Sequence, residues 1–168
     1  MKTLIIYHSK TGFTKKYAEW LSEASGCTLL PFDNAKKADF APYDTVVFAS
    51  SFQAGTIRKL NAFKNLKLNG KNKIVIVTGC TPPGSPEVDA AVQNNFKTDA
   101  GAYKVFYLPG GLSYERMGAA GKLMMSAFCK MIKKSAGEDS EMYSRISHSY
   151  DNTSKEYLQP VLNYLNSL

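Results

Sequence analysis

The chain has 168 residues, enough for one domain with a substantial core and too few for two domains of usual size. Its 44% hydrophobic and 21% charged residues are typical of a globular protein, and no apolar run approaches the ~20 residues that span a bilayer. The formal net charge of +7 favours anionic partners (small molecules, nucleic acid or a membrane surface) and counts against an acidic electron carrier.

Apolar runs alternate with helical patterns along the chain, at the spacing of repeated strand–helix–strand units. In chain order we predict a strand over residues 4–7, a helix over 11–25, strands over 27–30 and 44–50, a helix over 57–66, a strand over 73–78, a helix over 86–96, a strand over 103–108 and a closing helix over 154–167. Gly26 ends the first helix, and Pro86 suits the first turn of its helix. Pro160 predicts either a kink or a later start for the last helix.

The third and fourth strands predict the fold class. Both are continuous β-branched or aromatic runs, which is typical of strands buried on both faces of a parallel sheet. Right-handed crossovers then give a doubly wound α/β sandwich of five parallel strands, with helices on both faces. Without linker, repeat or low-complexity tract, residues 1–168 are expected to form a single domain. Ligands of such sheets bind beyond the carboxyl ends of the strands, where the winding reverses.

A hydroxyl-rich loop follows the first strand at this edge and leads directly into a helix. A helix N-terminus has unpaired backbone N–H groups and favours an anion. A glycine in this loop, Gly12, lets the backbone approach the anion closely. The alternative is an ordinary turn in which Ser or Thr caps the helix, although one cap would need only one hydroxyl. The loop fits neither a nucleotide-triphosphate loop nor a dinucleotide fingerprint, so a single phosphate is the better fit. Its residues are Ser9, Lys10, Thr11, Gly12, Phe13 and Thr14.

Two further loops leave the sheet at the same edge and are rich in small residues, which would let backbone groups meet the rim of a flat ring. Phe52 could pack against such a ring and Gln53 could form hydrogen bonds with it, whereas each loop alone could also be an ordinary strand exit. Together the three loops predict a site for flavin mononucleotide (FMN). The candidate residues are Ser50, Ser51, Phe52, Gln53, Ala54 and Gly55 after the third strand, and Thr78, Gly79, Cys80, Thr81 and Pro82 after the fourth.

On these three loops the whole chain resembles the flavodoxin-like FMN proteins. The resemblance implies that Lys10 and the hydroxyls of the first loop hold the phosphate. It implies that residues 50–55 contact the N5 and dimethylbenzene region of the flavin, and that residues 78–82 contact its pyrimidine edge.

A narrower resemblance concerns an insertion after the fifth strand. It is similar to the one in the quinone-dependent protoporphyrinogen dehydrogenases, a flavodoxin-fold branch of bacterial haem synthesis. The matching features are Gly111-Leu112, Tyr114, a methionine-rich basic helix and the exit Gly137-Glu138-Asp139. This resemblance implies a porphyrinogen or a quinone as the small-molecule electron donor or acceptor.

The insertion is expected to contain an amphipathic helix from Ser113 to Lys134. Its apolar side would carry Met117, Met124, Ala127, Phe128 and Met131, and its basic side Arg116, Lys122, Lys130, Lys133 and Lys134. Three interpretations remain open. The apolar side packs on the domain, lines a pocket beside the flavin for a quinone or tetrapyrrole, or lies on an anionic membrane surface.

These features favour an FMN-dependent oxidoreductase. One alternative is a flavodoxin-type carrier that passes single electrons to a redox protein partner, and another is a module that has lost its cofactor. No catalytic acid or base stands out, and neither a nucleic-acid module nor a metal site is expected. Cys27, Cys80 and Cys129 are scattered and predict no disulfide framework. Because no signal-peptide pattern is found, a cytoplasmic location is expected, with peripheral contact to the inner face of the membrane as an option.

Overall fold

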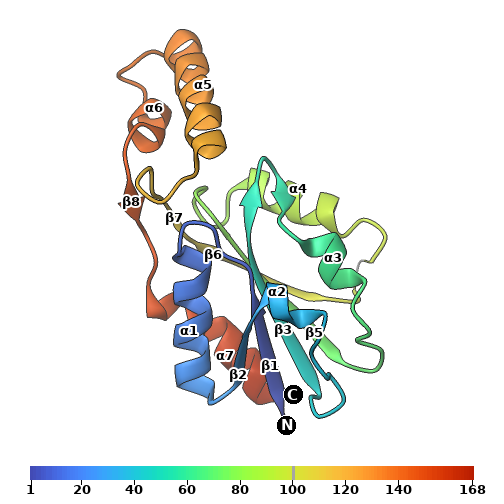
Figure 1. The fold of residues 1–168 in the computed structure, drawn as a ribbon. Helices are drawn as coiled ribbons and strands as arrows, with labels where there is room; N and C mark the ends of the chain where they lie inside the picture. The colour runs from blue at the N-terminus through green and yellow to red at the C-terminus, as the bar shows by residue number, and fades with distance from the viewer. Residues whose placement is uncertain (100) are drawn as a thin grey trace.

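The computed structural model describes residues 1–99 and 101–168 and shows a parallel sheet at the centre of the molecule (Figure 1). The order of its parallel strands is β2-β1-β3-β5-β6, so the chain winds outward in both directions from β1, as predicted. These strands are β1 (Thr3–Tyr7), β2 (Thr28–Pro31), β3 (Thr45–Gln53), β5 (Asn72–Gly79) and β6 (Lys104–Pro109).

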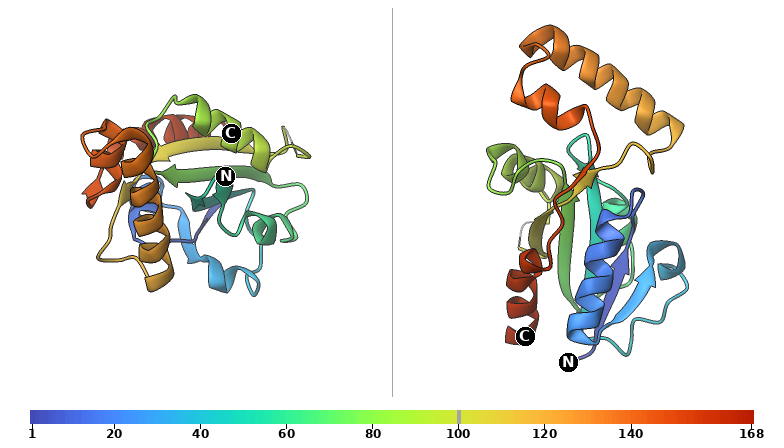
Figure 2. Two further views of the ribbon diagram at one scale, coloured as in Figure 1. Left: turned by 90° about the horizontal axis from the view of Figure 1, so that it is seen from above. Right: turned by 90° about the vertical axis from the view of Figure 1, so that its left-hand side faces the viewer.

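Helices cover both faces of the sheet, which Figure 2 shows from two further sides. One face packs against α1 (Phe13–Ser25), the short 3-10 helix η1 (Lys155–Leu158) and α7 (Gln159–Ser167), and the other against α2 (Phe32–Ala35), α3 (Leu60–Lys64) and α4 (Pro86–Asn95). Alternate residues of β3 serve the two cores, because Val46 and Phe48 join one buried cluster and Val47 and Ala49 the other. The continuous apolar pattern therefore predicted a doubly covered sheet correctly.

Most predicted boundaries agree with the structure to within a few residues. Helix α1 begins two residues later than predicted, because Gly12 has a positive φ of 97° that a right-handed helix does not allow. Gly26 ends this helix with φ 66°, and Pro86 occupies the first turn of α4. Pro160 lies in the first turn of α7, so the later start was the correct alternative.

The predicted loop after the third strand is in fact a β-hairpin. Strand β3 continues through Gln53 and pairs antiparallel with β4 (Thr56–Ile57). The two turn residues, Ala54 and Gly55, both have positive φ, 47° and 76°. This geometry matches the tight two-residue turns that suit the twist of hairpin strands.

The insertion extends beyond the carboxyl edge of the sheet (Figures 1 and 2). A small antiparallel ladder of β7 (Gly111–Leu112) and β8 (Tyr150–Asp151) forms its base, and α5 (Ala119–Ala136) and α6 (Glu141–Ile146) form its body. The predicted helical start at Ser113 is wrong, because the backbone turns after Ser113 and remains extended at Gly118 before α5 begins. Arg116 and Met117 therefore precede the helix. Across residues 1–99 and 101–168, no helix has the length and apolarity needed to cross a membrane.

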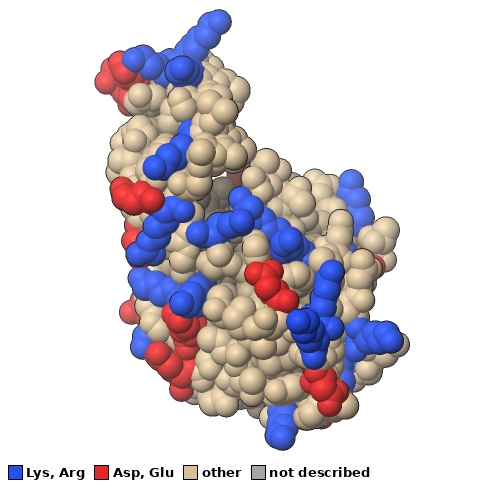
Figure 3. All heavy atoms as spheres, viewed as in Figure 1, with Lys and Arg blue, Asp and Glu red and all other residues tan. Residues whose placement is uncertain are grey.

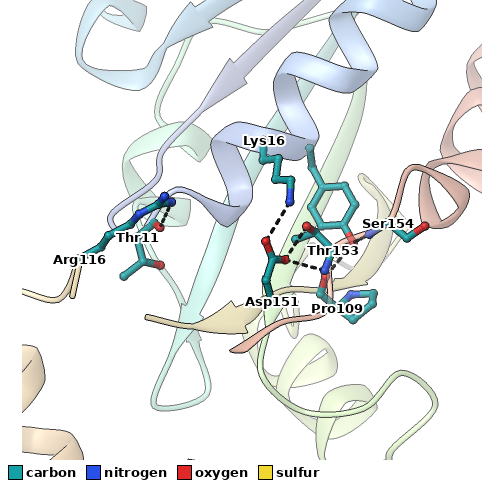
Figure 4. A network of polar contacts seen from close by, with 8 residues as sticks. Thr11, Lys16, Pro109, Arg116, Asp151, Thr153 and Ser154 are labelled. Atoms are coloured by element: carbon teal, nitrogen blue, oxygen red, sulfur yellow. Dashed lines mark hydrogen bonds and ion pairs between the residues drawn. The ribbon is translucent and has the colours of Figure 1, made fainter. Parts of the chain in front are cut away.

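Helix α1 holds both ends of the insertion (Figure 4). The buried Tyr17 hydroxyl donates a hydrogen bond of 2.7 Å to the carbonyl oxygen of Pro109 and accepts one of 3.3 Å from the backbone N–H of Ser154. Lys16 pairs with Asp151 at 2.8 Å. The chain leaves the sheet and returns at nearly the same point, since the N–H of Asn152 donates to the carbonyl oxygen of Gly110 at 2.9 Å.

Candidate functional site

A cavity of about 380 Å³ lies between the carboxyl ends of the central strands and the insertion. The volume is within the range of about 300–1,000 Å³ that is usual for small-molecule sites. All three predicted loops contribute to its wall. Of the candidate residues, the structure places the following along the cavity: Lys10, Thr11, Phe13, Thr14, Ser51, Phe52, Gln53, Ala54, Gly55, Thr78, Gly79, Cys80 and Thr81.

Four candidate residues do not line the cavity. Ser9 and Gly12 belong to the turn behind its wall, where the Ser9 hydroxyl accepts a hydrogen bond of 3.1 Å from the N–H of Gly12. Ser50 is fully buried and donates to the carbonyl oxygen of Arg58 at 2.8 Å, so its hydroxyl acts inside the hairpin. Pro82 lines a second hollow, of about 370 Å³, which lies against the return of the insertion.

The first turn of α1 is open to an anion. Gly12 occupies the N-cap position, and within the described residues no side chain caps the helix. The capping alternative therefore does not explain the hydroxyls of this loop, and the unpaired backbone N–H groups of the first turn can receive an anionic ligand. Thr14 contributes differently from the prediction, because its buried hydroxyl lies 2.7 Å from that of Thr78 and joins the two loops to each other.

Basic side chains surround this loop, and Figure 3 shows them gathered beneath the insertion. These charges act on His8, which lies beside the loop. Its pKa is lowered below the usual value, first by burial and then by the charges of Lys59, Lys10 and Arg58. The three cations around His8 outweigh the one opposing charge, Asp33. Arg58 also lines the cavity but was missed by the sequence analysis, since only the antiparallel return of β4 brings it back to this edge.

The hairpin after β3 is held by one side chain of α4. The amide nitrogen of Asn95 donates to the carbonyl oxygen of Gly55 at 2.7 Å, and its amide oxygen accepts from the N–H of Ile57 at 3.0 Å. The turn and the returning strand β4 are thereby fixed to α4. Phe52 leans toward Tyr107 across the sheet, with ring centroids 6.1 Å apart.

The loop after β5 is fixed by tyrosines and by the insertion. Tyr107 donates to the carbonyl oxygen of Thr81 at 2.6 Å, and Tyr150 to that of Cys80 at 3.3 Å. The Cys80 thiol donates to the carbonyl oxygen of Gly111 at 3.1 Å, and burial raises its pKa, so it stays protonated at neutral pH. The Cys80 side chain thereby ties the loop after β5 to the insertion.

The insertion supplies the opposite, apolar wall of the cavity. Met117 and Met124 were expected on the apolar side of the inserted segment, and both line the cavity. Met131, also expected on that side, is 55% exposed and lies away from it. The remaining residues of this wall were not predicted from the sequence. They are Gly110, Gly111, Leu112, Ser113, Gly121 and Met125. The sequence contains these glycines and methionines, but only the positions of β7 and α5 in the structure show which of them line the cavity.

Residues 4–140 match the family model of the flavodoxin domain. The chain belongs to the flavodoxin domain family. This membership agrees with the parallel sheet and the cavity at its carboxyl edge, and it supports the expectation of FMN as the cofactor. A comparison with curated proteins gives no significant match.

The flavodoxin-like domain also has similar solved structures. A protein from Bacteroides eggerthii, described as a flavoprotein, has a TM-score of 0.49 and 18% identity. The match covers 78% of this chain and 97% of that protein. The Trp repressor binding protein of Bacillus subtilis has a TM-score of 0.47 and 16% identity, over 65% and 83%. A Lactobacillus acidophilus flavoprotein solved in complex with FMN has a TM-score of 0.44 and 19% identity, over 64% and 91%.

Proposed function

We propose that the protein is an FMN-dependent oxidoreductase whose substrate is a largely apolar ring compound such as a quinone or a porphyrinogen. The observation that carries the proposal is the combination of two walls in one cavity. The sheet side offers an uncapped helix start among basic residues, and the insertion side offers methionines. An anionic cofactor suits the first wall and an apolar substrate suits the second.

The residues present fit FMN. Lys10, Thr11 and the backbone N–H groups that open α1 would hold its phosphate. The hairpin around Ala54 and Gly55 and the segment 78–81 would contact the ring from two sides, because both line the cavity. The cofactor supplies the transfer of hydride or electrons, and the protein supplies orientation and polarity.

The methionine wall supports a small-molecule substrate over the carrier alternative. Thioether side chains are flexible and adapt to irregular apolar surfaces, and Met124 is 44% exposed at the mouth of the cavity. A carrier that exchanges electrons only with proteins needs no such wall. The net charge of +7 also differs from the acidic surface expected of a carrier that serves basic partners.

The absorbance spectrum of the purified protein, followed by titration with FMN, tests the cofactor. Steady-state turnover with soluble quinones and porphyrinogens then tests the substrate, with Met124→Asp as the variant and Met131→Asp as its matched control on the same helix. We expect Met124→Asp to raise KM for the apolar substrate about tenfold or more, since a carboxylate in an apolar contact costs a few kcal/mol. Met131→Asp should leave KM unchanged.

Two results would contradict this proposal. A colourless protein that takes up no FMN would favour the module without a cofactor. An FMN-bound protein that a reductase reduces rapidly, but that turns over no quinone or porphyrinogen, would favour the carrier.

We also propose that α5 rests on an anionic membrane surface, where an apolar substrate would be met. Leu123 is 74% and Met131 55% exposed, and α5 contains four lysines and no acidic residue. Exposed apolar side chains beside lysines suit the interface of an anionic bilayer. The triple variant Lys122/Lys130/Lys133→Glu should lose binding to vesicles with anionic lipid, measured by co-sedimentation. Unchanged binding, or equal binding of the wild type to neutral vesicles, would contradict this contact.

A further inference from the structure

The turn that precedes α5 is fixed by hydroxyl groups. The Ser113 hydroxyl donates to the Glu115 carboxylate at 3.0 Å, and the Ser149 hydroxyl donates to the same carboxylate at 2.8 Å. Ser149 in turn accepts from the N–H of Tyr114 at 3.0 Å. These bonds to the ionised form, mainly from the Glu115 backbone and from Ser149, lower the pKa of Glu115. The Glu115 carboxylate thus accepts hydrogen bonds from two hydroxyl groups. These bonds hold in place the backbone of the turn, which carries Arg116 as its next residue.

Arg116 extends from this turn to the predicted phosphate loop (Figure 4). Its Nη1 donates to the carbonyl oxygen of Thr11 at 3.3 Å. The same nitrogen lies 2.6 Å from the position that a Cβ atom on Gly12 would occupy. The guanidinium group therefore covers the one residue of the loop that has no side chain, directly before the open first turn of α1.

Within residues 1–99 and 101–168, most of the hydrogen-bonding capacity of the Arg116 side chain is unused. A guanidinium group has five N–H donors, and the Thr11 carbonyl takes one of them. None of the ion pairs formed by residues 1–99 and 101–168 includes Arg116. An arginine held against an anion-accepting turn without an acidic partner is arranged for planar, two-point recognition of phosphate oxygens.

We infer that Arg116 binds the phosphate group of the cofactor, so that the insertion supplies part of the phosphate site. This inference rests on the proposed binding of FMN and adds a residue to it. The insertion then has a second function besides its methionine wall, because the phosphate joins it to the sheet. The competing explanation is that Arg116 only ties the insertion to the Thr11 carbonyl.

Titrations of the full-length protein with FMN and with riboflavin, which lacks the phosphate, separate the two explanations. Arg116→Gln should weaken FMN binding about tenfold or more, the factor expected for loss of a charge-assisted hydrogen bond, and should leave riboflavin binding unchanged. Arg116→Lys should recover only part of the loss, because lysine keeps the positive charge but lacks the paired N–H donors of the guanidinium group. Lys134→Gln, which removes an exposed cation from the last turn of α5 in the same insertion, is the control and should change neither affinity.

The outcomes distinguish this inference from the proposed function. If the wild type binds FMN and Arg116→Gln binds it equally well, only the role of Arg116 is overturned. An equal loss of FMN and riboflavin binding in Arg116→Gln would also overturn it and leave the tie to Thr11. A wild type that binds no FMN would overturn both the inference and the proposed function.

Discussion

The hydroxyl of Tyr17 and the carbonyl oxygen of Pro109 lie 2.7 Å apart at the point where the insertion leaves the sheet. The same hydroxyl receives the N–H of Ser154, where the chain returns from the insertion. Burial raises the pKa of Tyr17 to about 12, so the group remains a neutral donor at any physiological pH. A single side chain of α1 thus fixes both ends of the insertion to the core.

Tyr17→Phe should lower the free energy of unfolding by about 1–3 kcal/mol, because it leaves a buried carbonyl oxygen and an N–H group without their partner. Urea denaturation measures the change. Tyr157→Phe is the matched control, since Tyr157 is 42% exposed, and it should have an effect within about 0.5 kcal/mol. Equal effects of the two variants would show that the Tyr17 hydroxyl does not stabilise the junction.

The paired hydroxyls of Thr14 and Thr78 should behave as a unit. Thr14→Val and Thr78→Val should each cost about 1–3 kcal/mol of unfolding free energy, because each leaves the other hydroxyl buried without that partner. The double variant should cost less than the two single variants together, by about 0.5 kcal/mol or more. A thermodynamic cycle by urea denaturation measures the coupling, and strict additivity would exclude an energetic link between the two loops.

His8 should make the protein less stable in mild acid. Its pKa in the folded state lies below its value of 6.5 in the unfolded chain, so the unfolded chain binds more protons between these two values. The free energy of unfolding should therefore decrease as the pH falls through this window, and level off, for this group, below the folded-state pKa. His8→Asn should show a smaller decrease between pH 7.5 and pH 5 than the wild type, and exposed His148→Asn serves as the control. A His8→Asn profile parallel to that of the wild type would contradict the prediction.

The sheet domain should fold without the insertion. The N–H of Asn152 already contacts the carbonyl oxygen of Gly110, so a two-residue linker can replace residues 111–151 without strain at the ends. We expect native-like circular dichroism and one cooperative unfolding transition. Loss of cooperativity, with exposure of apolar surface to a fluorescent dye, would show that the insertion is part of the core.

The sequence predicted the sheet well because its signals are local. The continuous runs in β3 and β5, the stop at Gly26 and the start near Pro160 are each contained in a few neighbouring residues. The hairpin through Phe52 and Gln53 was missed, since a Ser-Ser-Phe-Gln stretch has little strand character until β4 pairs with it.

Features that depend on distant residues could not be predicted from local patterns. The ladder between Leu112 and Tyr150 joins segments that are far apart in the chain. Helical periodicity placed Arg116 among the lysines of a basic helix face, whereas the hydroxyl-bonded turn directs it to Thr11. The candidate site was thus predicted on its sheet side, and most of its insertion side required the structure.

Asn95 gives the turn at Gly55 a fixed orientation before any ligand arrives. Because the amide of this one residue bonds to the Gly55 carbonyl oxygen and to the Ile57 N–H, rotation of the Gly55 peptide would have to break a contact with α4. The hairpin is therefore held in one conformation at the edge of the cavity. The contacts that oppose its rearrangement come from Asn95 at the end of α4.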